Sequence, residues 1–243
     1  MNRTTVVTTF SPTNWRRYAS RTIPTWLEYF NRDADFHFHC DRPVVEDARI
    51  TYFSSSALKT EFIDRNQRLR RVFPVPGAKG FATRWETYCH KVFAQCESAF
   101  KTNSRFLLYL DADVAVLKSL PAGLLEDQLD RSFCGYIGRT TPCTETGFIL
   151  YDLWRDPQRT FFATFVHEYL SDRLFEFDDG WDDCHVFDRC RLQSRLPFKN
   201  LSGQYTDSLD PIALGPLGEY FDHWIGKASK KQGTSQFRHL RGA

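Results

Sequence analysis

The segment FLLYLDADVAVLKSLP (residues 106–121) starts with five large apolar residues and then places two acids, Asp111 and Asp113, one residue apart. A short unbroken apolar run of this kind predicts a buried strand. Because an ionised carboxylate is costly to bury, acids that directly follow such a strand are expected at its end, not inside the sheet. The segment therefore predicts a core strand over 106–110 with two carboxylates at its carboxyl end.

The residues before this strand alternate between strand patterns and helix patterns. We expect strands over 4–10 and 35–40, helices over 13–30, 55–71 and 83–101, and a loop over 75–81. Ser11 and Pro12 supply an N-cap and a first-turn proline for the helix over 13–30, which Pro24 is expected to interrupt. The alternation predicts an α/β fold, a Rossmann-type, mainly parallel sheet flanked by helices. Ligands of such sheets bind beyond the carboxyl ends of the strands, where the two aspartates are expected.

The second half of the chain mixes strands and helices. We expect strands over 132–139 and 144–152, helices over 157–174 and 178–196, and a turn-rich segment from 197 onward. The helix over 178–196 opens with an acidic, glycine-containing turn. We find no internal repeat and no linker, so one domain spanning 1–243 is expected.

The overall charge excludes a strongly polyanion-binding surface across the whole molecule, because the formal net charge is only +2. Two segments are nevertheless basic, residues 65–71 and residues 227–241. Each could contact phosphate, or could equally be a solvated face or tail.

The seven cysteines include no CxxC pair. Cys89, Cys96, Cys184 and Cys190 fall within predicted helices, which suits buried thiols, so a reduced and cytoplasmic protein is expected. The amino-terminal residues resemble no signal peptide, and no stretch approaches the ~18 apolar residues of a membrane span.

Two carboxylates at positions i and i+2 can share one hard cation, Mn²⁺ or Mg²⁺, and leave coordination positions for substrate phosphates. The alternative for Asp111 and Asp113 is a pair of solvated loop acids. The segment EYFDHWIGKASKK (219–231) favours the metal, because an imidazole at His223 can complete a Mn²⁺ shell. Gly226 allows backbone to approach an anion, and lysines beyond it, Lys227 or Lys230, can hold a phosphate.

With these motifs the sequence resembles the metal-dependent glycosyltransferases of the GT-A fold that use nucleotide-sugars, especially their retaining, glycogenin-like branch. It is similar also to less characterised bacterial and phage proteins of this kind. The resemblance implies a nucleotide-binding half (1–120), a sugar and acceptor half (121–226) and a basic tail (227–243). It implies Mn²⁺ or Mg²⁺ held by Asp111, Asp113 and His223, and a UDP-sugar as donor.

The resemblance also assigns further residues. VVTTF and the helix after it imply that Thr8, Thr9 and Tyr18 lie near the base, and CHKVFA implies that Lys91 faces the donor. TETGFILYD and GWDDCHVFD imply that Thr146, Gly147, Asp182 and Asp183 lie around the donor sugar.

The acidic turn can be interpreted from its own chemistry as well. One of Asp182 and Asp183 is expected to cap the following helix, and the other to orient the sugar or acceptor or to act as general base. We favour Asp183 for the second role. The glycogenin-like branch keeps a lysine six residues after the histidine, where this chain has Ser229, so either Lys227 or Lys230 is expected to grip the diphosphate.

The acceptor is expected to carry a hydroxyl group, and the candidates are a hydroxymethylated DNA base, a glycan, a small molecule or a protein. Three other functions compete with sugar transfer. The first is a haloacid-dehalogenase-like phosphatase with Asp111 as nucleophile. The second is a nucleotidyltransferase, although TTFSPTN (8–14) lacks the glycine-rich loop it needs. The third is an inactive binding module.

Overall fold

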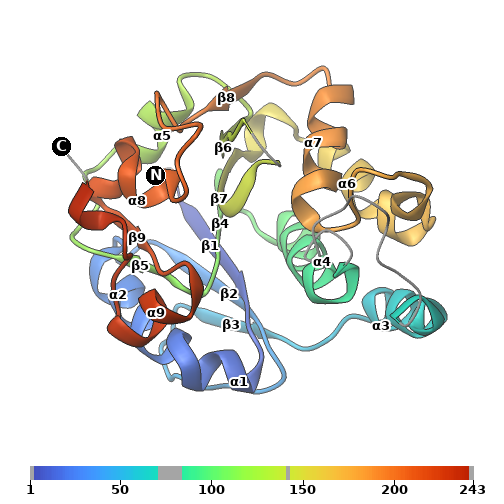
Figure 1. The fold of residues 1–243 in the computed structure, drawn as a ribbon, viewed down its shortest axis with the longest axis horizontal. Coiled ribbons are helices and arrows are strands. Elements are labelled where there is room, and N and C mark those ends of the chain that lie inside the picture. The colour runs from blue at the N-terminus through green and yellow to red at the C-terminus, as the bar shows by residue number, and fades with distance from the viewer. Residues whose placement is uncertain (1–2, 71–83, 141–142, 241–243) are drawn as a thin grey trace.

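The computed structural model describes residues 3–70, 84–140 and 143–240. Their central element is a seven-stranded sheet with the order β3-β2-β1-β4-β7-β6-β8 (Figure 1). Strands β3, β2, β1 and β4 run parallel, and β7 is antiparallel to both of its neighbours. The expected α/β fold with a mainly parallel sheet is therefore confirmed. The strands are β1 (Thr4–Thr9), β2 (Asp35–His39), β3 (Ile50–Phe53), β4 (Phe106–Leu110), β6 (Cys134–Ile137), β7 (Glu145–Asp152) and β8 (Phe198–Asn200).

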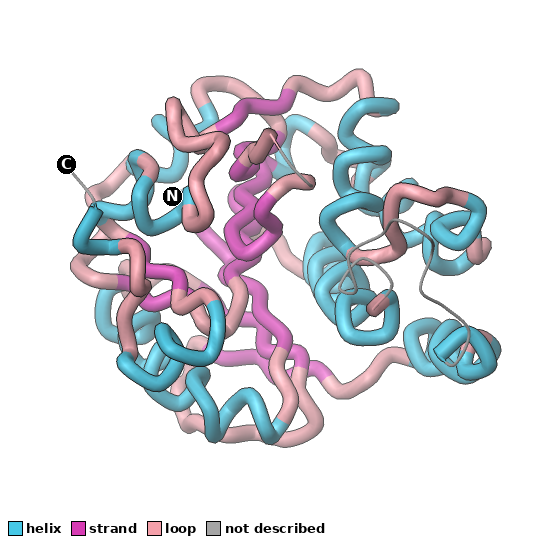
Figure 2. Tube along the Cα trace, viewed as in Figure 1, coloured by secondary structure: helices cyan, strands magenta, loops and turns pink. Residues whose placement is uncertain are grey.

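Helices cover both faces of this sheet, with the strands as a central layer (Figure 2). On one side lie α3, α4, α6 and α7, and on the other α2, α8 and α9 (Figure 1). The helices are α1 (Pro12–Asn14), α2 (Ser20–Tyr29), α3 (Ala57–Arg65), α4 (Trp85–Lys101), α5 (Leu124–Leu129), α6 (Thr160–Leu170), α7 (Asp183–Gln193), α8 (Pro211–Leu214) and α9 (Gly226–Gln232).

Strand β4 divides its side chains between the two hydrophobic cores, as alternation along a strand requires. Phe106, Leu108 and Leu110 belong to the core under α2, and Leu107 and Tyr109 belong to the core under α4. All five are buried, so the strand has no solvated face, and its acids can only follow it.

A second, two-stranded sheet lies on the α2 side and was not predicted. It pairs β5 (Val114–Val116) with β9 (Phe221–His223) in antiparallel register, with Val114 opposite His223. This sheet carries the C-terminal part of the chain back to the end of β4.

The predicted Ser11 cap is confirmed, because its side chain accepts a hydrogen bond from the backbone N–H of Asn14. The predicted interruption at Pro24 is wrong. After a π-helical turn over Trp15–Ala19, α2 continues through Pro24. Ile23 and Trp26 on either side are fully buried, and this packing offsets the hydrogen bond that proline cannot make.

The helix expected over 55–71 is shorter than predicted: α3 ends at Arg65, and a 3₁₀ turn follows over Gln67–Arg70. The expected loop over 75–81 lies outside the described residues. Among the described helices, none combines the length and the apolar composition that crossing a bilayer requires.

Candidate metal and diphosphate site

Asp111, Asp113 and His223 lie together just beyond the carboxyl end of β4. One potential ligand atom from each falls within 4.8 Å of the other two. His223 Nε2 lies 3.5 Å from Asp113 Oδ1, and Lys230 Nζ lies 2.6 Å from Asp113 Oδ2. The structure thus brings together the three residues proposed as metal ligands and one of the two candidate lysines.

The loop that carries the aspartates is fixed by hydrogen bonds from helix α2. Thr22 Oγ1 donates to the carbonyl of Ala112 at 2.6 Å, and Trp26 Nε1 donates to the carbonyl of Val114 at 2.6 Å. The backbone N–H of Val116 donates to Thr25 Oγ1. The continuous α2 therefore holds this loop in one position, which a metal site needs.

Gly147 in β7 lies directly against the acidic group. A Cβ atom at this position would lie 3.1 Å from His223 Cε1 and 3.4 Å from Asp111 Oδ2. The backbone N–H of Asp111 also donates to the Gly147 carbonyl at 2.9 Å. The close approach of the two strands and the imidazole explains why a glycine stands here.

Lys91 of α4 connects the aspartate loop to the acidic turn. Its Nζ lies 3.1 Å from an Asp111 carboxylate oxygen, 3.0 Å from Asp183 Oδ2 and 3.1 Å from Thr146 Oγ1. Burial would lower the pKa of Lys91, but the charges of Asp111 and Asp183 outweigh it and raise that pKa. The lysine therefore remains a cation between two carboxylates.

Asp182 and Asp183 have separate roles. Asp182 is the N-cap of α7: its Oδ1 accepts from the backbone N–H of His185 and lies 2.7 Å from His185 Nδ1. Asp183 points the other way and accepts from Thr146 Oγ1 at 2.5 Å. Burial raises the pKa of Asp183 to about 6, and the charge of Asp182 adds to the rise although Lys91 opposes it. One of the two aspartates caps the helix, as predicted, and the other faces Lys91.

The electrostatics and donor set around Asp113 suit a divalent cation. Burial would raise the pKa of Asp113, but His223 and Lys230 outweigh it and hold that pKa well below its usual range. Burial would lower the pKa of His223, but Asp113 raises it to about 9. Asp111 has a quarter of its side chain exposed, and His223 Nδ1 is buried without a hydrogen-bond partner among the described residues. Two carboxylates and one imidazole fit Mn²⁺ or Mg²⁺.

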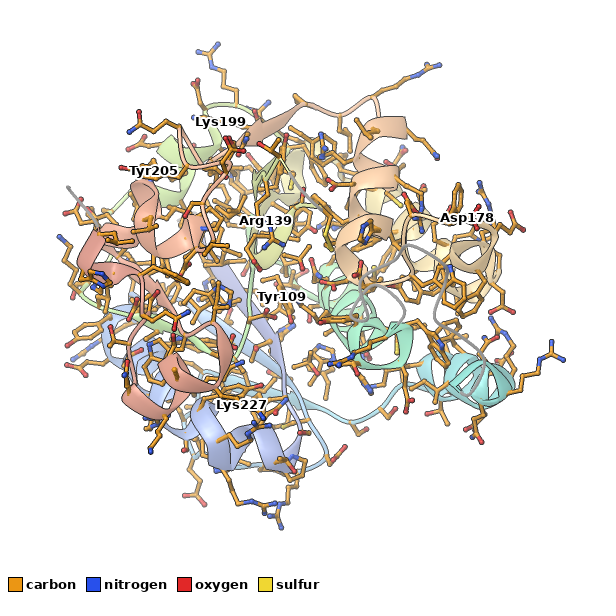
Figure 3. All side chains as sticks on the ribbon, viewed as in Figure 1. Tyr109, Arg139, Asp178, Lys199, Tyr205 and Lys227 are labelled. Carbon is orange, nitrogen blue, oxygen red and sulfur yellow. A yellow bond between two sulfur atoms is a disulfide. The ribbon has the colours of Figure 1, made fainter. Side chains whose placement is uncertain are left out.

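The two candidate lysines occupy different environments. Lys230 contacts Asp113, and its Nζ lies 4.7 Å from the centre of the Tyr18 ring. Lys227 is exposed on α9 (Figure 3). Ser229 is fully buried, and its hydroxyl accepts a hydrogen bond from the backbone N–H of Gln236. Gly226 adopts a φ of +77°, and a Cβ atom at this position would have no neighbouring atom within 4 Å.

The residues expected near the base are not all in one place. Thr9 lines a cavity of about 490 Å³ at the carboxyl ends of β1, β2 and β3. Thr8 is fully buried, and its hydroxyl has no hydrogen-bond partner among the described residues. Tyr18 lies beside Lys230 and is not among the residues that line the cavity.

Sequence reasoning missed three residues that support the site. Tyr109 OH donates to Asp111 Oδ1 at 2.9 Å. Glu145, which is buried, accepts from the Gly147 N–H at 2.9 Å and pairs with Arg139 at 3.0 Å. Figure 3 shows Tyr109 and Arg139 in the middle of the molecule, between the α9 side and the α7 side. Of the three, only Tyr109 could have been found from the sequence: it stands two residues before Asp111, and residues two apart along a strand point to the same face.

Cys143 and Cys184 form a disulfide, so the expectation of reduced thiols is wrong for this pair. The bond joins the segment before β7 to the first turn of α7. Beside it, Thr144 donates its N–H and its hydroxyl to Asp188. Three links therefore hold Thr146 of β7 next to Asp183 of α7. The two cysteines are 41 positions apart and match no spacing motif, which is why the sequence did not reveal them.

The basic segments are partly committed to internal contacts. Arg65 donates to the carboxylate of Asp172 and to the carbonyls of Tyr169 and Leu170, at the end of α6. Lys230 is paired with Asp113. These two cations do not form a free surface for a polyanion.

The seven-stranded, mainly parallel sheet flanked by helices is that of the GT-A glycosyltransferase fold, and comparison with solved structures agrees. No family model and no curated protein matches the sequence. The chain is similar to apo mouse xyloside xylosyltransferase 1, with 12% identity over 82% of this chain and 85% of that one, at a TM-score of 0.52. It is similar also to the galactosyltransferase LgtC in complex with donor and acceptor sugar analogues. The identity is 12% over 93% of this chain and 88% of LgtC, and the TM-score is 0.52.

A third similar structure is the glycosyltransferase GlyE of Streptococcus pneumoniae, with 12% identity and a TM-score of 0.53. The match covers 99% of this chain but only 59% of GlyE, so this chain spans about three fifths of that protein. At these identities the likeness establishes the fold. It does not favour the phosphatase, the nucleotidyltransferase or the inactive module.

Proposed function

We propose that this protein is a metal-dependent glycosyltransferase that moves a sugar from a nucleotide-sugar, a UDP-sugar, to a hydroxyl group of an acceptor. The observation that carries the proposal is the convergence of Asp111, Asp113 and His223, with Lys230, at the carboxyl edge of the sheet. The three similar structures are glycosyltransferases, and one of them was solved with donor and acceptor analogues.

Asp111, Asp113 and His223 would hold Mn²⁺ or Mg²⁺, which supplies positive charge to the diphosphate of the donor and of the leaving group. Lys230 is the better placed of the two lysines for the diphosphate, because its ammonium already lies at Asp113. An ammonium there binds phosphate oxygens as a point charge.

Lys91, Thr146 and Asp183 would position the donor sugar. Their mutual contacts of 2.5–3.1 Å hold the Asp183 carboxylate in one orientation before the donor binds. A carboxyl group with a pKa of about 6 is mostly deprotonated at neutral pH. Because this pKa is close to neutral pH, the carboxylate can accept a proton from an attacking hydroxyl. Asp183 would therefore orient the sugar or acceptor, or act as the general base.

Transfer with retention of the anomeric configuration belongs to this proposal, and the NMR spectrum of the product tests it, since a β-linked product from an α-linked donor would contradict it. The acceptor is a hydroxyl compound. A hydroxymethylated DNA base stays a prediction from the sequence, beside a glycan, a small molecule or a protein.

The decisive experiment incubates the protein with Mn²⁺ and a panel of nucleotide-sugars and measures released nucleoside diphosphate. We expect release from at least one UDP-sugar, loss of release with a chelator, and loss in Asp113→Ala. Asp178→Ala is the matched control, because Asp178 is an exposed acid away from the site (Figure 3). Release that persists in Asp113→Ala, or folded protein that releases nucleotide from no donor, would refute the proposal.

A further inference from the structure

The cavity at the ends of β1, β2 and β3 contains a lysine that no role assigned so far explains. Lys59 of α3 lines this cavity of about 490 Å³ together with Thr9, Ser11, Cys40 and Ser55. Only 9% of Lys59 is exposed, although it belongs to a surface helix. Its ammonium has no hydrogen-bond or ion-pair partner among residues 3–70, 84–140 and 143–240.

The other ionisable groups of the cavity make Lys59 distinctive. Burial lowers the pKa of His39 to about 3 and that of His90 to about 4, so both rings are neutral at pH 7. Asp41 and Glu86 are the acids among the described lining residues, and Asp41 is exposed. Lys59 is thus the one positive side chain in that lining at neutral pH. A largely buried ammonium without a partner is costly, which is the condition that a polar ligand relieves.

The sheet places this cavity within reach of the metal group. Thr9 pairs with His39, which pairs with Phe53, and Val7 pairs with Tyr109. By this register Thr9 stands level with Asp111 on the next strand. Neighbouring strands are about 4.8 Å apart, so the ends of β2 and β3 lie roughly 10–14 Å from that of β4. A diphosphate at Asp111 and Asp113 can therefore deliver its nucleoside to the cavity.

We propose that Lys59 selects the base of the donor by donating a hydrogen bond from its ammonium to the carbonyl oxygen at C4 of uracil or at C6 of guanine. Uracil carries an oxygen at C4 and guanine at C6, where cytosine and adenine carry an amino group, which is a donor. An ammonium is a hydrogen-bond donor without any acceptor capacity. It can therefore bind the oxygen of uracil or guanine, but it faces a second donor in the amino group of cytosine or adenine. The inference rests on the proposed use of a nucleotide-sugar and deepens it, by naming the residue that reads the base.

The test measures dissociation constants for UDP, GDP, CDP and ADP by calorimetry in the presence of Mn²⁺. A hydrogen bond to a charged group predicts that wild-type protein binds UDP or GDP at least about tenfold more tightly than CDP and ADP. Lys59→Met keeps the length of the side chain and removes the charge. This variant is expected to bind the preferred nucleotide at least about tenfold more weakly than the wild type, and to bind CDP and ADP with nearly unchanged affinity. Lys59→Arg should restore the preference, and Lys118→Met, at an exposed lysine elsewhere, should not alter it.

The outcomes separate this inference from the function on which it rests. If Lys59→Met, folded by circular dichroism, keeps the wild-type ratio of UDP to CDP affinity, the role of Lys59 is refuted. In that case Mn²⁺-dependent nucleotide binding that disappears in Asp113→Ala would leave the proposed function intact. If wild-type protein binds none of the four nucleotides with Mn²⁺, the proposed function is refuted, and the inference about Lys59 is refuted with it.

Discussion

Val114 pairs with His223 across the antiparallel strands β5 and β9, and this pairing sets the imidazole beside the carboxylate of Asp113. The backbone N–H of Trp224 donates to the Asp113 carbonyl at 3.0 Å and closes the same junction. A residue near the C-terminus is therefore fixed to the end of β4 by main-chain hydrogen bonds. A cation bound there would cross-link two distant parts of the chain and stabilise the folded state by an amount that grows with the logarithm of its affinity.

His223→Ala and Asp113→Ala should each weaken Mn²⁺ binding by at least about 100-fold, because each removes one of the three proposed ligands. Titration followed by the Mn²⁺ EPR signal measures this, and Asp178→Ala should bind Mn²⁺ as the wild type does. In wild-type protein, saturating Mn²⁺ should also raise the melting temperature, and this rise should disappear in both ligand variants. Wild-type affinity in His223→Ala would show that the histidine is not a ligand.

Lys230→Met and Lys227→Met form a matched pair that tests which lysine grips the diphosphate. Lys230 lies 2.6 Å from Asp113 Oδ2, whereas Lys227 is exposed on the same helix. We expect Lys230→Met to weaken UDP binding with Mn²⁺ by about tenfold, and Lys227→Met to change it by less than about threefold. Lys230→Met should not weaken the binding of Mn²⁺ in the absence of UDP, because the substitution removes a cation that competes with the metal for Asp113. Equal effects of the two variants on UDP would contradict the assignment.

The parts of this fold that follow from local pattern were predictable from the sequence. The apolar run over 106–110 and the two acids after it define β4 and its polar end, because both signals lie within eight residues. The helix cap at Ser11 is local in the same sense. The continuity of α2 through Pro24 was not predictable, since it depends on the tertiary burial of Trp26 and Ile23.

That Asp111, Asp113 and His223 lie together was predictable from the sequence, but the geometry that brings them together was not. Strands β5 and β9 have three residues each, too few for a periodic signal, so the pairing of Val114 with His223 could not be derived. The same holds for the bond between Cys143 and Cys184, because sequence separation carries no information about which cysteines meet. Both are non-local contacts whose cost in chain entropy is repaid only in the complete fold.

Asp183→Asn should abolish transfer and yet stabilise the protein above pH 6. Burial raises the pKa of Asp183 from 3.8 to about 6, so the folded state binds the extra proton between these values. The carboxyl therefore lowers the free energy of unfolding as pH rises through this window, by roughly 3 kcal/mol once pH exceeds 6. The neutral amide avoids this cost, and Lys91 keeps Asp111 as a partner.

Urea denaturation of wild-type protein and of Asp183→Asn at pH 4 and at pH 7.5 measures this effect. The variant should gain about 2–3 kcal/mol relative to the wild type between the two pH values. In the wild type, kcat/KM should rise with pH through about 6, as the carboxylate forms. A constant difference in stability between variant and wild type would show that Asp183 is not held with a raised pKa.

The disulfide between Cys143 and Cys184 predicts five free thiols per chain in denaturant and seven after reduction, because the other five cysteines are free. By the chain-entropy estimate for a 41-residue loop, Cys143→Ser should lower the free energy of unfolding by about 4 kcal/mol. Cys184→Ser and the double variant should lower it by the same amount, since all three remove one bond. Because the bond lies beside the Thr146–Asp183 contact, each variant should also lower kcat more than it changes the affinity for UDP. Seven reactive thiols in untreated protein, or additive effects of the two substitutions, would show that the cysteines act separately.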